Sequence, residues 1–172
     1  RPRELADALQ IGTVDLAIGP FPDISGAGIH TETLFERGFL CVVAQDHPRL
    51  GKGGLTLPAF LQEAHLVVSS PGRTEEVFER FLDEKKLKRR IALSVPHMLC
   101  VPAVIAASEL IATVPESVGR DFQSYEGLRV IPPPIETPVI RVAQYWIERF
   151  AKDPATTWLR AQVRMLFARR AG

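Results

Sequence analysis

The chain has 172 residues, of which 46% are hydrophobic and 24% charged, and its formal net charge is +1. This composition is typical of a globular protein with one or two hydrophobic cores. A charge so close to zero argues against a protein whose main partner is nucleic acid or a membrane surface, and the longest apolar run, residues 98–107, is too short to span a bilayer.

The first third of the chain predicts a helix followed by three strands. Apolar positions in residues 3–11 fall on one helical face. The apolar run 14–18, interrupted only by Asp15, is typical of a parallel sheet that is covered on both faces. After a Gly-Pro-Phe-Pro turn, residues 29–33 alternate as in a half-buried strand, and residues 39–44 are apolar throughout.

The rest of the chain alternates between the two kinds of element. A serine cap followed by proline opens a helix at Ser70. Further helices are predicted at 57–63, 96–108 (with a possible kink at Pro102), 116–122 and 153–170, and strands at 65–70, 90–95, 110–115, 128–134 and 139–149. Strands that alternate with helices predict an α/β fold with mainly parallel sheets.

Two long apolar strands, residues 39–44 and 139–147, bracket a central β-α-β-α-β unit. The flanks must then pair with each other, so the chain leaves one subdomain, builds a second and returns. We expect a first subdomain at 1–43 plus 142–172 and a second at 44–141, each Rossmann-like, joined by two crossover strands. The cleft between such lobes is a natural ligand site.

Five residues are candidates for ligand binding. Ser69 and Ser70 lie where a strand gives way to a helix, and free N–H groups and hydroxyls at such a point attract a carboxylate; alternatively Ser70 is a plain helix cap. His97 opens the next helix and could donate a hydrogen bond, or it is a capping or surface histidine. Phe21 could stack on an aromatic ligand or cover the core edge, and Thr137 is either a hinge-side ligand contact or a turn residue.

Other chemistries find little support. A hydrolase could combine Ser69, His97 and Asp23, but the G-x-S-x-G elbow is absent. No metal-site spacing and no phosphate loop occurs, so we expect no catalytic residue, metal or cofactor. The basic run at 85–90 could contact DNA phosphates, although cations also suit a helix C-terminus, which is the favoured interpretation. The cysteines, Cys41 and Cys100, predict buried thiols in a reduced cytoplasmic chain, with a disulfide as the alternative.

Four segments in order resemble the effector-binding domain of LysR-type transcriptional regulators: LADALQIGTVDLAIG, LCVVAQDHP, VPAVIAASELIATVPESV and DPATTWLRAQV. The segments PHMLCVPAVIAASELIATVP and YWIERFAKDPATTWLR resemble the branch of nodulation regulators and regulators of aromatic-compound metabolism. One departure is Ser108-Glu109-Leu110, where many relatives have Gly-x-Gly.

The resemblance implies a type 2 periplasmic-binding-protein-like fold and a sensor, not an enzyme. Its expected partners are a small aromatic or carboxylate effector, further copies in a dimer or tetramer, and DNA through a helix-turn-helix domain ahead of this segment. It also implies that the first strand and helix of subdomain I precede Arg1, and that His97 contacts the effector. The rival interpretation is a transporter's solute-binding protein with the same architecture.

Overall fold

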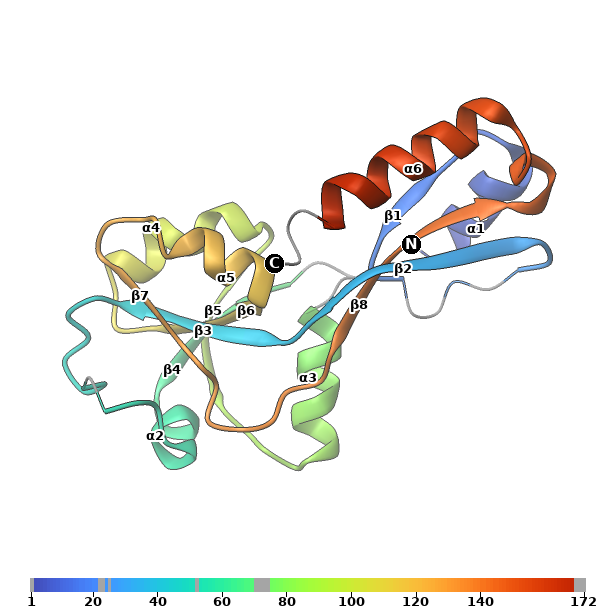
Figure 1. The fold of residues 1–172 in the computed structure, drawn as a ribbon. Helices are drawn as coiled ribbons and strands as arrows, with labels where there is room; N and C mark the ends of the chain where they lie inside the picture. The colour runs from blue at the N-terminus through green and yellow to red at the C-terminus, as the bar shows by residue number, and fades with distance from the viewer. Residues whose placement is uncertain (1, 22–23, 25, 52, 70–74, 169–172) are drawn as a thin grey trace. The chain divides into compact units, whose positions relative to one another are not determined.

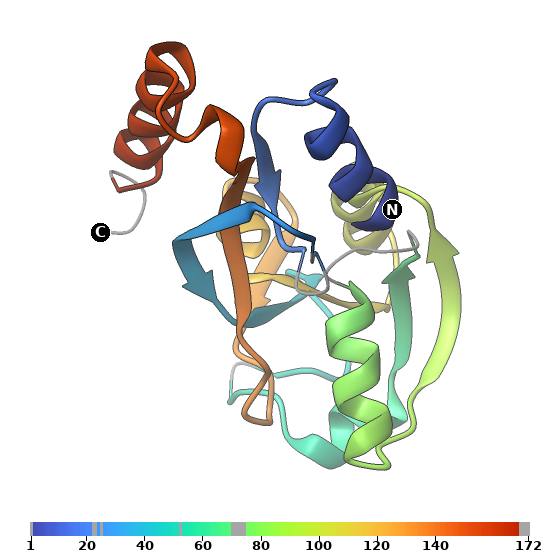
Figure 2. The ribbon, with the colours of Figure 1, turned by 90° about the vertical axis from the view of Figure 1, so that its right-hand side faces the viewer.

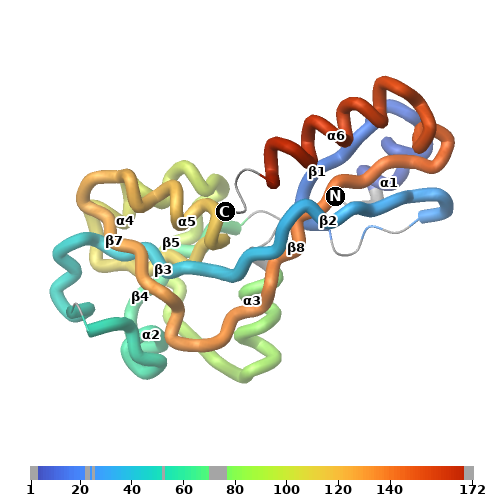
Figure 3. Tube along the Cα trace, viewed as in Figure 1, coloured from blue at the N-terminus to red at the C-terminus, as the bar shows by residue number. Residues whose placement is uncertain are grey.

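The computed structural model describes residues 2–21, 24, 26–51, 53–69 and 75–168 (Figure 1). It confirms the α/β class, and the chain divides into two compact units. The first unit comprises Arg1–Glu36 and Ile140–Gly172, and the second comprises Arg37–Val139. The chain therefore passes into the second unit once and returns once, a path that can be followed in Figure 3.

The first unit has a three-stranded sheet in the order β1-β8-β2. Its elements are α1 (Pro2–Ile11), β1 (Ala17–Gly19), β2 (Ile29–Arg37, whose last residue opens the second unit), β8 (Ile140–Ile147), the 3-10 turn η2 (Glu148–Phe150) and α6 (Pro154–Ala168). Gly12 ends α1 with φ +88°, a left-handed conformation that glycine adopts without strain.

The predicted parallel strand at 14–18 is wrong in extent and direction. β1 has three residues and pairs antiparallel with β8, and Asp15 is exposed outside the strand. Its neighbour comes from the far end of the chain, so the local β-α alternation does not fix the direction of pairing.

The two faces of this sheet are covered by different helices. Leu9 of α1 packs with Ala17, Ala143 and Tyr145 on one face. On the other, the Arg160 guanidinium of α6 lies 4.2 Å from the Trp146 ring centroid. Odd and even positions of β8 thus face different helices, as a pleated strand requires. The predicted cap of α6 is confirmed, because the Asp153 carboxylate accepts the Thr156 N–H at 2.8 Å.

The second unit has a five-stranded sheet in the order β5-β4-β6-β3-β7. Its elements are β3 (Phe39–Ala44), α2 (Leu57–Gln62), β4 (Ala64–Val68), α3 (Glu75–Glu84), β5 (Arg90–Val95), η1 (Met98–Cys100), α4 (Val101–Ala106), β6 (Ile111–Pro115), α5 (Glu116–Phe122) and β7 (Leu128–Ile131). β4 is parallel to β5 and β6, whereas β3 is antiparallel to β6 and β7.

The expectation of mainly parallel sheets is therefore wrong, since the sheet of the second unit is mixed. The physical reason is the path of the chain. β3 leads away from the unit boundary, and β4, β5 and β6 run back toward it, each after a helix or turn that reverses the chain. A strand that enters a sheet from the opposite end must pair antiparallel.

Helices cover both faces of this sheet. α4 and α5 pack over the cluster that includes Val42, Leu66, Val101, Ile105, Val114 and Phe122. On the opposite face Phe78 of α3 lies 5.0 Å from Phe39, and Phe60 of α2 contacts His65 at 4.6 Å, both measured between ring centroids. Figure 2 shows β5 outermost beside β4, with α3 in front. Among the described residues, none of the helices combines the length and apolar character that a bilayer crossing requires.

Two local details follow from backbone chemistry. Pro102 lies in the first turn of α4, which begins at Val101 after η1, and not inside a helix that starts at residue 96; at this position the missing N–H needs no partner. The turn at Ser108–Leu110 needs no glycine, because none of its residues has a positive φ. Among the described residues, the one non-glycine residue with a positive φ is Lys86. The turn is fastened instead by Glu109, whose carbonyl accepts from His47 Nε2 at 3.0 Å and whose carboxylate pairs with Arg49 at 2.7 Å.

Replacing Lys86 with glycine is expected to stabilise the second unit. Lys86 follows α3 with φ +56°, a left-handed conformation that strains a residue with a Cβ atom. Glycine removes this strain, so the free energy of unfolding should rise by about 0.5–1 kcal/mol. Urea denaturation measures the change, and Lys88→Gly, in the extended segment beyond the turn, serves as the control that should not gain stability.

Candidate functional site

Three parallel strands of the second unit end at the same edge of the sheet. Val68, the last residue of β4, pairs with Val95, the last residue of β5. Pro115, the last residue of β6, pairs with Phe39, the first residue of β3. The loops after β4, β5 and β6 therefore open at one edge, beside the start of β3. Ligands of α/β sheets bind characteristically at the carboxyl ends of parallel strands, and we call this region the carboxyl edge.

Ser69 lies at the carboxyl edge, directly after β4. Its N–H donates to the Val95 carbonyl at 2.9 Å, which extends the β4–β5 ladder by one residue and fixes the backbone there. Ser69 itself is exposed, so its hydroxyl can donate to or accept from a bound molecule. Ser70, the other predicted serine, lies outside the described residues.

His97 lies at the same edge, two residues beyond β5. It is exposed and precedes η1, but its imidazole makes no capping hydrogen bond, and its carbonyl accepts the Cys100 N–H at 3.1 Å. The capping alternative is therefore not what the structure shows. Two residues further, Leu99 is 83% exposed. Leu99 was not among the predicted site residues, since nothing in the apolar sequence 98–107 distinguishes it from its neighbours.

Thr137 lies on the β3 side of this edge. Its Oγ1 accepts the Phe39 N–H at 3.4 Å, and a Cβ atom on Gly38 would lie 3.0 Å from that oxygen. The Gly38 carbonyl in turn accepts the Glu116 N–H at 2.9 Å. Thr137 thus holds the backbone at the start of β3, and its hydroxyl proton remains able to donate to a ligand.

Phe21 belongs to the first unit. Its ring lies 5.7 Å from that of Tyr145, and its carbonyl accepts the Tyr145 hydroxyl at 3.4 Å. Burial raises the pKa of Tyr145. Phe21 packs against the α1-side core of this unit, which is the arrangement that the covering alternative describes. Three of the five predicted residues therefore lie at the carboxyl edge of the second unit: Ser69, His97 and Thr137.

A buried polar network lies on the α2–α3 side of the second unit's sheet. Arg89 pairs with Glu79 and contacts His65 Nδ1 at 3.1 Å, and His65 Nε2 lies 2.7 Å from the Phe60 carbonyl. Because Nε2–H donates to that carbonyl, Nδ1 carries no proton and accepts from Arg89. Burial, reinforced by the Arg89 charge, lowers the pKa of His65 to about 4. The sequence analysis missed this network, since Arg89 stands within a run of surface cations.

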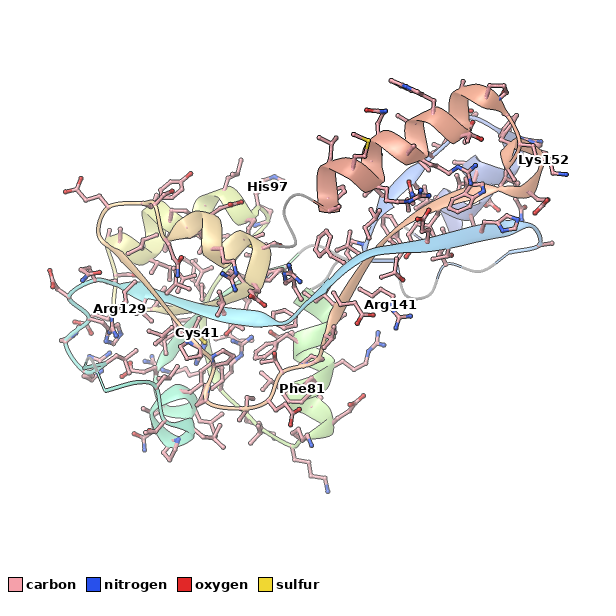
Figure 4. All side chains as sticks on the ribbon, viewed as in Figure 1. Cys41, Phe81, His97, Arg129, Arg141 and Lys152 are labelled. Carbon is pink, nitrogen blue, oxygen red and sulfur yellow. The ribbon has the colours of Figure 1, made fainter. Side chains whose placement is uncertain are left out.

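Cys41 lies in the core of the second unit, whereas Cys100 is half-buried in η1, three residues beyond His97. Cys41 and Cys100 are both free thiols. Cys41, labelled in Figure 4, is fully buried, and burial raises the pKa of its thiol to about 12. Among the described residues, no group of three or more metal-ligating side chains comes together.

Residues 1–168 match the family described as the LysR substrate binding domain. The chain is 32% identical to the HTH-type transcriptional activator NahR of Pseudomonas putida over 95% of this chain and 54% of that protein. It is 38% identical to the HTH-type transcriptional regulator LinR of Sphingobium indicum over 91% of this chain and 52% of that protein. Nodulation D proteins of rhizobia are among the further relatives.

The regulatory domain of MexT, a transcriptional activator in Pseudomonas aeruginosa, superposes with a TM-score of 0.78 at 25% identity, over 94% of this chain and 76% of that one. The chain spans about half the length of the curated relatives it matches. These relatives are transcriptional regulators and not enzymes, and they do not favour the solute-binding alternative.

Proposed function

The chain belongs to the LysR substrate binding domain family, and from this premise we propose that it is the effector-sensing part of a DNA-binding transcriptional regulator. The complete protein would bind DNA through a helix-turn-helix domain, as the names of NahR and LinR indicate for those relatives. It would act in the cytoplasm as a dimer or tetramer. This chain would supply the binding of a small molecule.

The carboxyl edge of the second unit supports an effector that carries both a ring and a carboxylate. Ser69 offers a hydroxyl, and His97 offers an exposed imidazole that makes no capping hydrogen bond; both groups can hydrogen-bond a carboxylate. Leu99, 83% exposed, offers an apolar surface close by in sequence. The observation that carries the proposal is the exposed imidazole of His97 beside the paired ends of β4 and β5.

Sensing requires that the effector bind one conformation of the protein more tightly than another. A difference of about 1–3 kcal/mol between the two binding free energies changes the equilibrium constant between the two conformations by about 5- to 150-fold. Thr137 supports such a role at the start of β3, because its hydroxyl already holds the Phe39 N–H where the chain enters the second unit.

Titration of this chain with four probes tests the proposal. Salicylate and benzoate carry both groups, cyclohexanecarboxylate lacks the aromatic ring, and phenol lacks the carboxylate. We expect the thermal midpoint to rise most with the aromatic acids, because binding to the folded state stabilises it. His97→Ala and Ser69→Ala should each weaken binding about tenfold, the effect of losing one hydrogen bond to a charged group.

Ser124→Ala, an exposed serine between α5 and β7 at the opposite end of the sheet, is the matched control and should bind as the wild type does. Stabilisation by an aromatic acid that survives both His97→Ala and Ser69→Ala would remove the site from the carboxyl edge. Stabilisation by amino acids or sugars, with no response to any aromatic acid, would favour a solute-binding protein instead.

A further inference from the structure

The chain carries a cluster of cations that the proposed sensing function does not use. Residues 85–90 read Lys-Lys-Leu-Lys-Arg-Arg and join α3 to β5. The structure separates these cations into two groups. The Arg89 side chain is 4% exposed and pairs with Glu79. The other four are exposed, and we call them the basic strip: Lys85, Lys86, Lys88 and Arg90.

The end of α3 does not need these side chains as caps. The backbone N–H groups of Lys85, Lys86 and Leu87 donate to the carbonyls of residues 81–83, at 2.9–3.1 Å. The last turn is therefore closed by the backbone itself, as in other left-handed helix ends. What remains is attraction to the helix dipole, which is worth about 0.3–1 kcal/mol for an exposed charge and does not account for four neighbouring cations.

Most of the basic strip also lacks a carboxylate partner. Lys86, Lys88 and Arg90 form no ion pair with any described residue. Lys85 Nζ lies 6.0 Å from the ring centroid of Phe81, which Figure 4 labels on α3. The exposed carboxylates of the same helix end, Asp83 and Glu84, are outnumbered by the four cations.

The backbone places two of these cations on a common face. Leu87 and Arg89 are at least partly buried, whereas Lys88 and Arg90 are exposed, which is the alternation of an extended chain. Alternate residues of such a chain are about 6.6 Å apart, a spacing comparable to that between successive phosphates of one DNA strand. Arg90 opens β5, an edge strand of the sheet, so a partner can reach this face without disturbing a neighbouring strand.

We propose that the basic strip contacts the phosphate backbone of DNA held by the complete regulator. The inference rests on the proposed function, which brings duplex DNA to this protein. The contact is independent of base sequence, because it consists of cations against phosphates. The chain's net charge of +1 makes it a local contact that adds to the binding of another DNA-binding domain.

Fluorescence anisotropy with a labelled 30-base-pair duplex tests this surface on the present chain, at about 20–150 mM KCl. The wild-type chain should bind the duplex weakly, with an affinity that falls as salt rises. The triple variant K86Q/K88Q/R90Q should bind at least tenfold more weakly at low salt. Its slope of log affinity against log salt should be smaller by about 3, since each lost phosphate contact removes about 0.9.

The control variant R120Q/R149Q/K152Q removes the same charge elsewhere on the surface and should bind within about threefold of the wild type. The thermal midpoints of both variants are measured to establish that each is folded. Equal losses in the two variants would show that net charge alone matters and would overturn the proposal. So would a strip variant that loses binding to poly-glutamate while keeping its binding to DNA, since the partner would then be an acidic polypeptide.

The aromatic-acid titration, repeated on the strip variant, separates this inference from the proposed function. A strip variant that keeps the thermal response to salicylate but loses DNA binding supports the DNA contact on a working sensor. If salicylate and benzoate fail on every variant while the strip variant alone loses DNA binding, the sensing proposal fails and the DNA contact stands. A wild-type chain with no salt-dependent DNA binding overturns the DNA contact alone.

Discussion

Arg89→Ala is expected to lower the free energy of unfolding of the second unit by about 2–4 kcal/mol. The Arg89 guanidinium pairs with Glu79, contacts His65 Nδ1, and lies 5.4 Å from the Phe78 ring centroid and 6.0 Å from that of Phe60. Alanine removes all of these contacts and leaves a cavity between α2, α3 and the sheet. Glu79, whose side chain is 42% exposed, can regain water, which keeps the loss below that of a fully buried ion pair.

Urea denaturation at pH 7 measures the loss, and two further variants interpret it. Arg89→Met keeps the volume and the contacts with the aromatic rings without a buried charge, so it should cost about 1 kcal/mol or less. Burial lowers the pKa of Arg89, and its Nε has no hydrogen-bond partner among the described residues, so burial of the charge opposes part of the stabilisation that its contacts provide. Arg90→Ala is the matched exposed control and should stay within about 0.5 kcal/mol of the wild type. If Arg89→Ala also lowered the free energy of unfolding by no more than about 0.5 kcal/mol, the structural role of the Arg89 network would be contradicted.

Acidification from pH 7 to pH 5 is expected to destabilise the fold by about 2 kcal/mol through His65 alone. Its pKa is about 4 in the folded protein against 6.5 in the unfolded chain. Between these values the unfolded state binds a proton that the folded state does not, so stability falls as pH falls. The full difference corresponds to about 3 kcal/mol, reached below pH 4. Above pH 6.5 neither state binds the proton, and the effect disappears.

His65→Gln removes the titrating group and tests the assignment. The variant is less stable at pH 7 because the contacts with Arg89 and the Phe60 carbonyl change. Its unfolding free energy should nevertheless vary less between pH 7 and pH 5, by about 2 kcal/mol. The range stops at pH 5 because carboxylates with lowered pKa values, such as Glu63 beside Arg49, lose stabilisation at lower pH. Parallel pH profiles for the two proteins would exclude His65 as the source.

Much of the fold was predictable from local sequence patterns. The strand at 39–44 and the strand at 90–95 have the predicted bounds, and the cap at Asp153 is confirmed by its hydrogen bond. Each of these depends on residues close together in the chain: apolar runs, β-branched residues, and a carboxylate followed by proline. Strand direction was not predictable in this way, because the partners of β1 and β3 come from distant segments.

The candidate site was predictable only in part. The position of Ser69 and His97 at one edge follows from the sequence, because each comes after a strand and parallel strands bring their ends to one edge. Leu99 was missed because an exposed leucine and a core leucine look alike in sequence. Phe21 was assigned by its position in the sequence to the first subdomain, and the structure describes it in the first unit, against Tyr145.

The sequence by itself determined the element order, the α/β class and the family resemblance, because hydrophobic periodicity and helix caps depend only on residues that are close together in the chain. The tertiary structure alone decided the directions of the strands and the roles of the cations. Within one basic run it buries Arg89 between aromatic rings and leaves Lys88 and Arg90 in solvent. Identical charges take opposite roles there because burial depends on which way each side chain points from the backbone, and packing across the sheet sets that direction.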